Sequence, residues 1–295
     1  MRLHLVDGTY ELFRAHHSPG PGRSDPHGRD VKATVGVVSS LLSLLDDGDE
    51  AVTHLAVTFD NPIESFRNRL FEGYKDSTGV EENLLEQFDL VERATAALGV
   101  AVWPMDEYEA DDAMATAAVA FCDRVDQVRI LTPDKDLGQV VRGEQIVQVD
   151  RARRRVVDEA GVTEKLGVPP ASVADHLALV GDTADGIPGL PGFGAKTSSR
   201  LLTRYGRLEQ IPADASDWDV EVRGAARLAE TLRERWEDAV LYRDLATLRL
   251  DVPLDDDLDD LQWDGVPEGP WHALCDDLGV GRLRDRPNRW ADDDT

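Results

Sequence analysis

Short apolar runs alternate with helix-type patterns through the first half of the chain. The runs at 3–6, 54–59, 100–103 and 127–131 have the length and composition of buried strands. Apolar residues at helical spacing cover 9–16, 31–45, 63–72, 84–98 and 109–122. Strands that alternate with helices predict an α/β fold, in which a doubly wound, mostly parallel sheet is covered by helices on both faces.

The pattern changes after about residue 145. Residues 145–157 resemble a β-hairpin whose turn, 151–155, is basic. Helices are then predicted at 158–166, at 170–180, from 195 onward, at 225–243 and at 271–278. We therefore predict two domains: an α/β domain at 1–160 and a helical domain at 161–295 that ends in an acidic segment.

Composition removes several classes of protein. No apolar run reaches the about 18 residues that a membrane-spanning helix requires. The N-terminus, MRLHLVDGTY, lacks a signal-peptide pattern. The cysteines, Cys122 and Cys275, match no metal-ligand spacing and are expected to be buried thiols in a reducing compartment. These features predict a cytoplasmic protein without a membrane partner.

The charge of the chain complicates the choice of partner. The formal net charge is −26, which by itself argues against binding to nucleic acid, because phosphates are also negative. A site that holds several metal ions needs many carboxylates, however, so part of this negative charge is compatible with a metal-dependent function.

Carboxylates recur at the ends of the predicted strands. Asp7, Asp60 and Asp134 follow three of them, and an acidic group opens the helix after the strand at 100–103. Ligands of doubly wound sheets bind beyond the carboxyl ends of the strands. Any single aspartate has the alternative role of a helix cap or a solvated residue, so the shared position carries the inference. The complete set is Asp7, Asp60, Glu109, Asp111, Asp112, Asp134, Asp136, Asp182 and Asp185.

This set predicts hard divalent cations. Ligand sets made only of oxygen suit Mg²⁺ or Mn²⁺ rather than Zn²⁺. So many carboxylates repel one another unless cations lie among them, and two ions roughly 3.5–4 Å apart can clamp both reacting oxygens of a phosphodiester. If Glu109, Asp111 and Asp112 all act, the helix should begin near Ala110, with Glu109 still in the preceding loop.

Residues 181–202 join two of the carboxylates to a cradle suited to phosphate. Asp182 and Asp185 share one face if their segment is helical. The glycine–proline hairpin at 189–194 then opens into a helix near Ala195, whose free N–H groups and positive dipole end attract an anion. The candidate phosphate-binding residues are Gly189, Gly192, Gly194, Lys196 and Thr197.

Two other readings of this segment exist. A P-loop is disfavoured because Ala195 separates the last glycine from the lysine. A plain turn between two helices, with a solvated aspartate pair, stays open as the structural alternative. Gly192 and Gly194 are expected to adopt dihedral angles that other residues avoid, and to let a ligand approach closely.

Few basic residues accompany the carboxylates. Arg14, Arg67 and Lys75 flank the first two predicted strands, and a solvated helix face is their alternative explanation. His16 and His17 are expected to be loop residues rather than metal ligands.

Five segments, in this order, resemble the 5′-nuclease family, which includes flap endonucleases and the N-terminal 5′→3′ exonuclease domain of bacterial DNA polymerase I. The segments are LVDGTYELFRAHH at 5–17, VTFDNPIESFRNRLFEGYKD at 57–76, YEADDAMA at 108–115, LTPDKDLGQVV at 131–141 and LALVGDTADGIPGLPGFGAKTSSRLL at 177–202. The last segment is the most specific. No polymerase sequence follows, so the resemblance is to a free-standing exonuclease.

The resemblance implies a PIN-like or resolvase-like sheet followed by a helix–three-turn–helix element, also called helix–hairpin–helix, at 181–202. In the family this element grips duplex DNA phosphates, often with a K⁺ ion, and the candidate carboxylates line the metal site. Tyr74 and Lys75 match residues that steer the scissile phosphate at the base of an arch, which here spans about 74–88. Arg14 and Arg67 match basic residues of the same site.

The chain departs from the family pattern at three points. Thr78 stands where many members carry arginine, the arch segment 79–82 is acidic, and Gly186 replaces a frequent asparagine. The short acidic arch puts the threading of a single-stranded flap in doubt.

The function implied is that of a metal-dependent 5′→3′ exonuclease and structure-specific 5′-flap endonuclease in DNA replication and repair, which uses a two-metal mechanism. Its expected partner is DNA with 5′ ends or flaps, and we expect a monomer with a functional link to a DNA polymerase and ligase. A non-catalytic binder of branched DNA is the first alternative, disfavoured because a binder does not need this many like charges. A PIN-type ribonuclease is the second, disfavoured because those domains usually lack the hairpin.

Overall fold

The computed structural model describes residues 1–292 and divides the chain into two compact units that interrupt each other in sequence. The first, here called the sheet unit, comprises residues 1–63, 77–132 and the chain from 250 onward. The second, the helical unit, comprises 64–76 and 133–249. The compact units therefore do not follow the predicted division into 1–160 and 161–295.

The sheet unit is built on four parallel strands, as the apolar runs predicted. These are β1 (Arg2–Asp7), β2 (His54–Asp60), β3 (Ala101–Met105) and β4 (Gln127–Leu131), in the spatial order β3-β2-β1-β4. β1, β2 and β4 are buried along almost their whole length, which is why their sequences are continuous apolar runs rather than alternating ones.

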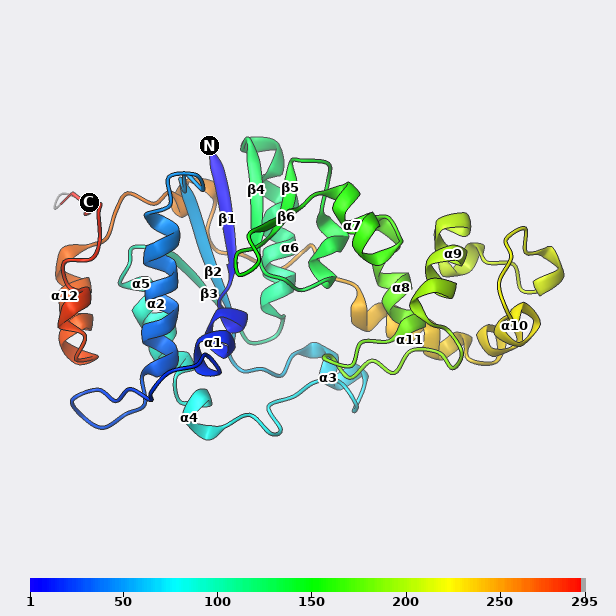
Figure 1. The fold of residues 1–295 in the computed structure, drawn as a ribbon, viewed down its shortest axis with the longest axis horizontal. Coiled ribbons are helices and arrows are strands. Elements are labelled where there is room, and N and C mark those ends of the chain that lie inside the picture. The colour runs from blue at the N-terminus through cyan, green and yellow to red at the C-terminus, as the bar shows by residue number, and fades with distance from the viewer. Residues whose placement is uncertain (293–295) are drawn as a thin grey trace. The chain divides into compact units, whose positions relative to one another are not determined.

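Helices connect these strands in two directions. The chain moves from β1 through α1 (Gly8–His16) and α2 (Lys32–Leu45) to β2, and through α5 (Phe88–Ala96) to β3. It then returns through α6 (Ala110–Phe121) to β4, on the far side of β1. Because such crossovers are right-handed, α6 covers the opposite face from α1, α2 and α5 (Figure 1). The reversal makes the gap between β1 and β4 the switch point of the sheet.

One helix of the sheet unit differs from prediction. The pattern at 84–98 predicted a single helix, but the structure has α4 (Glu82–Leu85) and then α5. The side chain of Gln87, at the break, is buried; its Oε1 accepts hydrogen bonds from the backbone N–H and hydroxyl of Thr34, and its Nε2 donates to the Asn83 carbonyl. The hydrogen-bonded Gln87 side chain lies at this break, which separates α4 from α5.

The C-terminal segment belongs to the sheet unit, which corrects its predicted place in a helical domain. Figure 1 shows α12 (Glu268–Asp277), in orange, beside α2. The Arg29 guanidinium pairs with the Asp277 carboxylate at 3.0 Å, and Arg286 pairs with Asp46 at the end of α2. The backbone N–H of Trp263 donates to the Thr53 carbonyl at 3.0 Å.

The helical unit confirms the predicted hairpin and most of the predicted helices. β5 (Ile146–Asp150) and β6 (Arg155–Val157) form the antiparallel hairpin. The helices are α3 (Phe66–Leu70), α7 (Glu159–Leu166), α8 (Val173–Val180), α9 (Ala195–Tyr205), α10 (Ala225–Glu234) and α11 (Trp236–Ala246). α8 packs against both α9 and α11, around a core that includes Leu177, Leu201 and Leu245. α3 is shorter than the predicted 63–72 because Ser65 caps its start. Within residues 1–292, none of the helices has the length and apolar character needed to span a membrane.

Candidate metal centre and phosphate-binding hairpin

The first candidate carboxylate ends β1 at the switch point of the sheet. Asp7 is 8% exposed; its Oδ1 accepts the Tyr10 backbone N–H at 2.7 Å, which caps α1, and its Oδ2 accepts the Thr132 hydroxyl at 2.9 Å. Gly8 follows because the chain passes directly over β2: an added Cβ would lie 2.6 Å from the Thr58 carbonyl oxygen. The turn therefore fixes the Asp7 carboxylate at the sheet edge.

The second and third carboxylates of the sheet unit meet at the start of α6. Asp60 ends β2, and its Oδ1 accepts the Ala110 backbone N–H at 2.7 Å. Glu109 is the N-cap of α6 and forms a capping box with Asp112, whose carboxylate accepts the Glu109 N–H at 3.1 Å. The helix thus begins at Ala110, as predicted for three acting carboxylates. Asp111, in the first turn, is half-buried.

These contacts combine the two readings that the sequence left open. The carboxylates of Asp7, Asp60 and Glu109 do accept hydrogen bonds at helix starts, as caps do. They also lie at the carboxyl ends of adjacent parallel strands, where ligands bind. Backbone N–H groups and helix dipoles favour negative charge at a helix start, so these positions suit carboxylates.

The helical unit gathers a tighter group, here called the aspartate cluster: Asp136, Asp182 and Asp185. One carboxylate oxygen from each lies within 4.8 Å of the others, and the three residues are 5%, 6% and 9% exposed. Asp134 stands beside them, with its Oδ1 accepting the Asp136 backbone N–H at 2.9 Å. The set consists only of oxygens, which suits a hard divalent cation.

The segment that carries Asp182 and Asp185 is not helical, so the helical-face argument for this pair was wrong. Asp182 and Ile187 exchange two backbone hydrogen bonds of 2.8 Å, which close a tight turn. The Asp182 Oδ1 also accepts the Ala184 N–H at 3.1 Å. The two carboxylates are brought together by the turn instead of by helical periodicity.

The burial and the like charges of the aspartate cluster favour binding of a divalent cation. Burial, followed by the charges of Asp134 and Asp185, raises the pKa of Asp136 well above its ordinary value. The Asp136 Oδ1 is buried, and among residues 1–292 no hydrogen-bond donor faces it. An orphaned buried oxygen is costly unless an ion or a proton satisfies it. A divalent cation would do so and would favour the ionised form.

Two lysines partly neutralise the aspartate cluster. The ammonium of Lys135 pairs with Asp182, and the Lys75 ammonium lies 3.0 Å from the Asp185 Oδ1. Burial lowers the pKa of Lys135, but the hydrogen bond to Asp182 and the charge of Asp136 outweigh it, so the pKa is raised overall. Lys135 was missed from the sequence; its signal was a rare lysine between two candidate aspartates.

Lys75 and Tyr74 are tied to the aspartate cluster by the backbone. The Lys75 N–H donates to the Asp185 carbonyl at 3.0 Å, and the Tyr74 side chain is buried in the core of the helical unit. Gly186 explains the departure from the family's asparagine: its φ is +74°, and an added Cβ would lie 2.1 Å from the Gly73 carbonyl oxygen. Only glycine lets these two backbone segments come this close.

The predicted arginines have other surroundings. Arg67 is 2% exposed, and its guanidinium donates to the carbonyls of Leu245 and Thr247 at 2.7 and 3.0 Å. This placement makes Arg67 an anchor of the helical unit, and its role beside the scissile phosphate stays a prediction. Arg14 is exposed on α1 and pairs with Glu11.

The hairpin leads into α9 as predicted. Gly194 is the N-cap, no side chain caps this helix, and Gly192, Gly194 and Lys196 are exposed at its start. Gly194 has an ordinary φ of −108°, so the expectation of an unusual dihedral angle was wrong there, although Gly192 has a φ of +87°. Nothing lies within 4 Å of a Cβ built on Gly194, so the open space still permits close approach of a ligand. Thr197 is half-buried.

Gly189 has a packing role. It is buried, with a φ of +69°, and an added Cβ would lie 2.5 Å from the backbone of Val180 and Gly181. Its smallness lets the hairpin return against α8, and it presents no surface to a phosphate.

The chain matches two family descriptions over most of its length. Residues 2–167 match "5'-3' exonuclease, N-terminal resolvase-like domain", and residues 168–268 match "5'-3' exonuclease, C-terminal SAM fold". DNA polymerase I of Rhizobium leguminosarum is 38% identical over 265 residues, covering 88% of this chain and 26% of the relative. DNA polymerase I of Bacillus caldotenax is 32% identical over 284 residues, covering 94% of this chain and 31% of the relative. The chain thus spans about a quarter to a third of the length of these relatives.

Solved structures agree on the fold. The T5 D15 protein co-crystallised with metal ions aligns with a TM-score of 0.65 at 19% identity, covering 85% of this chain and 90% of that one. The catalytic core of Rad2 in complex with DNA substrate aligns with a TM-score of 0.60 at 15% identity, covering 96% and 89%. The predicted resolvase-like sheet followed by a helical region is confirmed. The chain belongs to the 5′–3′ exonuclease family.

Proposed function

We propose that this chain hydrolyses phosphodiester bonds at DNA 5′ ends and 5′ flaps, with Mg²⁺ or Mn²⁺ as cofactor. The observation that carries the proposal is the aspartate cluster, in which three carboxylates converge and one buried oxygen of Asp136 has no hydrogen-bond partner within residues 1–292. Membership of the 5′–3′ exonuclease family supports the reaction class. The likeness to the T5 D15 flap endonuclease, solved in complex with DNA and metal ions, supports the substrate class.

The proposed ligands of the cofactor ions are the nine candidate carboxylates. In the helical unit these are Asp134, Asp136, Asp182 and Asp185, and in the sheet unit Asp7, Asp60, Glu109, Asp111 and Asp112. When bound, two or more divalent ions would activate a water nucleophile and stabilise the charge on the leaving oxygen.

The other residues bind and orient the DNA. Lys75 is held against Asp185, from where its ammonium is proposed to meet the negative charge that develops on the scissile phosphate, with Tyr74 fixing its backbone. Gly192, Gly194 and Lys196 open the α9 N-terminus to a phosphate of the duplex arm. A K⁺ ion at this hairpin, a monomeric state, cytoplasmic action and a link to a DNA polymerase and ligase are also part of the proposal, and rest on the family.

Cleavage of labelled substrates tests the proposal. We expect the protein to cut 5′-flap DNA and blunt duplex DNA with Mg²⁺, and to lose this activity in EDTA. Asp136→Asn should be inactive, whereas Glu230→Gln, which alters an exposed carboxylate on α10, should keep full activity.

The same substrates distinguish the alternatives. Tight binding of flap DNA without cleavage under any divalent ion would identify a non-catalytic binder. Cleavage of single-stranded RNA in preference to flap DNA would identify a ribonuclease. Either result would overturn the proposal.

A further inference from the structure

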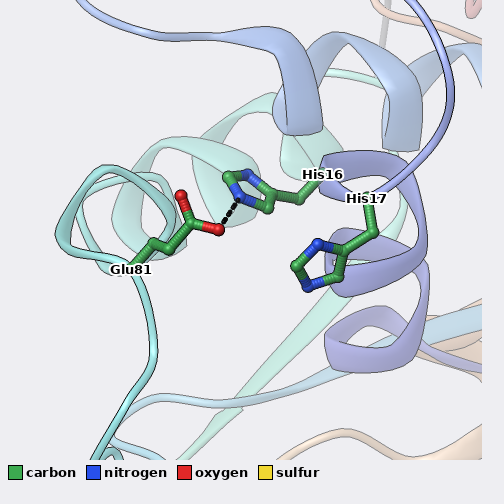
Figure 2. A group of neighbouring side chains, drawn as sticks. All are labelled: His16, His17 and Glu81. Carbon is green, nitrogen blue, oxygen red and sulfur yellow. Dashed lines mark ion pairs between the residues drawn. The ribbon is translucent and has the colours of Figure 1, made fainter.

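A second group of metal-ligating side chains lies in the sheet unit, apart from the carboxylates of the strand ends. His16, His17 and Glu81 each offer a ligand atom within 4.8 Å of the other two. The prediction of loop residues holds for His17, which is the C-cap of α1 and lies in a turn, but was wrong for His16, which is the last residue of α1. Figure 2 shows the His16 imidazole directed at the Glu81 carboxylate, with the His17 imidazole beside it.

The geometry matches two ligands of one ion. His16 Nε2 and Glu81 Oε1 lie 3.3 Å apart, and ligand atoms of a tetrahedral zinc ion with bonds of about 2.0–2.1 Å are separated by roughly 3.4 Å. The His16 and His17 rings are nearly perpendicular, at 85°, with centroids 4.9 Å apart. His17 and Glu81 are exposed, so their side chains can rotate to close the remaining distance.

The anchor of the group is rigid, and its other ligands are adjustable. The His16 side chain is 9% exposed, against 63% for Glu81. Lys32 fixes the end of α1 by donating from its ammonium to the carbonyls of His16 and Ser18 at 2.7 and 2.8 Å. A site of this kind has one preformed ligand on which the others converge.

We propose that His16, His17 and Glu81 form a site for a borderline-soft transition metal ion such as Zn²⁺. Two neutral imidazoles and one carboxylate select Zn²⁺, Ni²⁺ or Cu²⁺ over Mg²⁺, which prefers oxygen ligands. Three protein ligands leave a coordination position for water. The site is independent of the proposed nuclease function, because none of its residues is a candidate ligand for Mg²⁺.

The site is expected to exchange its ion readily. The His16 Nδ1 is buried, and no acceptor faces it among residues 1–292. When Nε2 binds a metal, the ring proton stays on Nδ1, where a strong site provides an acceptor. Loss of such an outer partner typically weakens metal binding by about 10–100-fold. The structure therefore points to a site that fills and empties with the supply of the metal.

A bound ion would tie together two segments that are distant in sequence. Glu81 is the residue before α4, in the segment predicted to form the arch, and His16 ends the helix that Asp7 begins. α1 has nine residues and is thus about 13 Å long, too long for one ion to contact both of its ends. The ion would hold residues 77–85 against the far end of that helix.

Metal binding to purified variants tests the site. Zn²⁺ is titrated against a chromophoric chelator in excess Mg²⁺, which saturates the carboxylate ligands. Wild-type protein should bind one more equivalent of Zn²⁺ than His17→Ala or Glu81→Gln, or should bind it more tightly. The expected difference in affinity is about 10–100-fold or more, because a direct ligand is worth at least as much as an outer partner. His27→Ala removes an exposed histidine of the following loop and should bind Zn²⁺ like wild type.

A second readout follows the segment that carries Glu81. Amide hydrogen exchange over residues 77–85 should slow when Zn²⁺ is added to wild-type protein, and should not change in His17→Ala. Equal Zn²⁺ stoichiometry and affinity in wild type, His17→Ala and Glu81→Gln would overturn the proposal, and so would unchanged exchange in wild type. Neither readout depends on nuclease activity.

Discussion

The candidate carboxylates of the two units are compensated in different ways. In the sheet unit, Asp7 and Asp60 accept backbone N–H groups at helix starts, and Glu109 shares a capping box. In the helical unit, the aspartate cluster relies on the side chains of Lys75 and Lys135, and one Asp136 oxygen stays unsatisfied. Main-chain donors are common to the first group, whereas lysine ammonium groups neutralise the second.

This difference in compensation predicts that the two groups respond differently to a metal ion. Main-chain donors and helix dipoles are fixed by the fold, so they compensate the sheet-unit carboxylates whether or not an ion is present. The aspartate cluster carries like charges in a buried setting, so a divalent cation has most to gain there. Lysine side chains can swing away when an ion arrives, whereas backbone N–H groups cannot. We expect the energetic response to metal to come chiefly from the helical unit.

The largest expected effect is on catalysis. Asp182→Ala or Asp136→Asn should lower kcat by more than roughly 10³-fold, because direct stabilisation of the reacting phosphate depends on these ligands. Binding of flap DNA measured with Ca²⁺ should change little, since the ions serve the transition state more than docking. Steady-state cleavage and fluorescence anisotropy give the two quantities.

Asp214→Asn provides the matched control for these variants. Asp214 is an aspartate of the helical unit whose carboxylate accepts hydrogen bonds from the N–H and hydroxyl of Ser216, and its replacement should leave kcat unchanged. Full activity of Asp182→Ala would remove this residue from the metal centre.

The next effect concerns Lys75, one of the two lysines that pair with the aspartate cluster. Lys75→Ala should lower kcat by about 10²-fold, on the scale of a donor aimed at developing negative charge. KM should stay within a few-fold, since the proposed contact strengthens only in the transition state. If Lys75→Ala raises KM and leaves kcat intact, Lys75 binds DNA in the ground state instead.

A smaller effect is expected at the α9 N-terminus. Lys196→Ala should weaken substrates with a duplex arm by about 1–2 kcal/mol, the scale of one charge-assisted hydrogen bond. The change should appear in KM, because a phosphate remote from the cut bond is held equally in ground and transition states. Single-stranded substrates serve as the control. An equal loss with and without the duplex arm would show that Lys196 does not contact the duplex.

The smallest expected effect is on the free energy of unfolding, measured in EDTA. Asp7→Ala removes a helix cap and should destabilise the protein by about 1 kcal/mol. Asp136→Asn should stabilise it near neutral pH. Burial and neighbouring carboxylates raise the folded-state pKa of Asp136, so the stability this group contributes at low pH is lost as pH rises from the ordinary carboxyl value through the raised one. Asparagine cannot ionise and escapes that loss.

Urea unfolding across a pH series measures both changes. Saturating Mg²⁺ should reverse the order of wild type and Asp136→Asn, because only wild type keeps the ligand. A lower stability of Asp136→Asn than of wild type in EDTA at neutral pH would show that the charged form of Asp136 is already well compensated.

The parts of the fold and site that rest on local patterns were predictable. The strands and the hairpin at 145–157 follow from apolar runs and turn residues, and the start of α6 at Ala110 follows from the need to aim three carboxylates. Family motifs were specific enough to predict the 5′-nuclease assignment. Each of these features is set within a few residues of sequence.

The parts that depend on distant partners were not predictable. Nothing local to Arg67 reveals that carbonyls some 180 residues away hold its guanidinium. Lys135 pairs with Asp182 across a long stretch of chain, and Gly189 is set by the backbone of α8. His16 and His17 were not predicted to be metal ligands, because nothing near them in the sequence indicates that Glu81 lies opposite them. A charge or a glycine does not reveal its tertiary neighbour.

The interleaving of the two units has a consequence for how the chain is made. Domains usually fold as they emerge from the ribosome, the N-terminal one first. Here the sheet unit takes 1–63, 77–132 and the segment that begins at residue 250, and the helical unit takes 64–76 and 133–249. The strands at the N-terminus must therefore wait for the segment from 250 onward before their unit is complete. Synthesis completes the helical unit before the sheet unit, and a stop codon just before residue 250 leaves a nascent chain that has strands β1–β6 but lacks the C-terminal segment of the sheet unit.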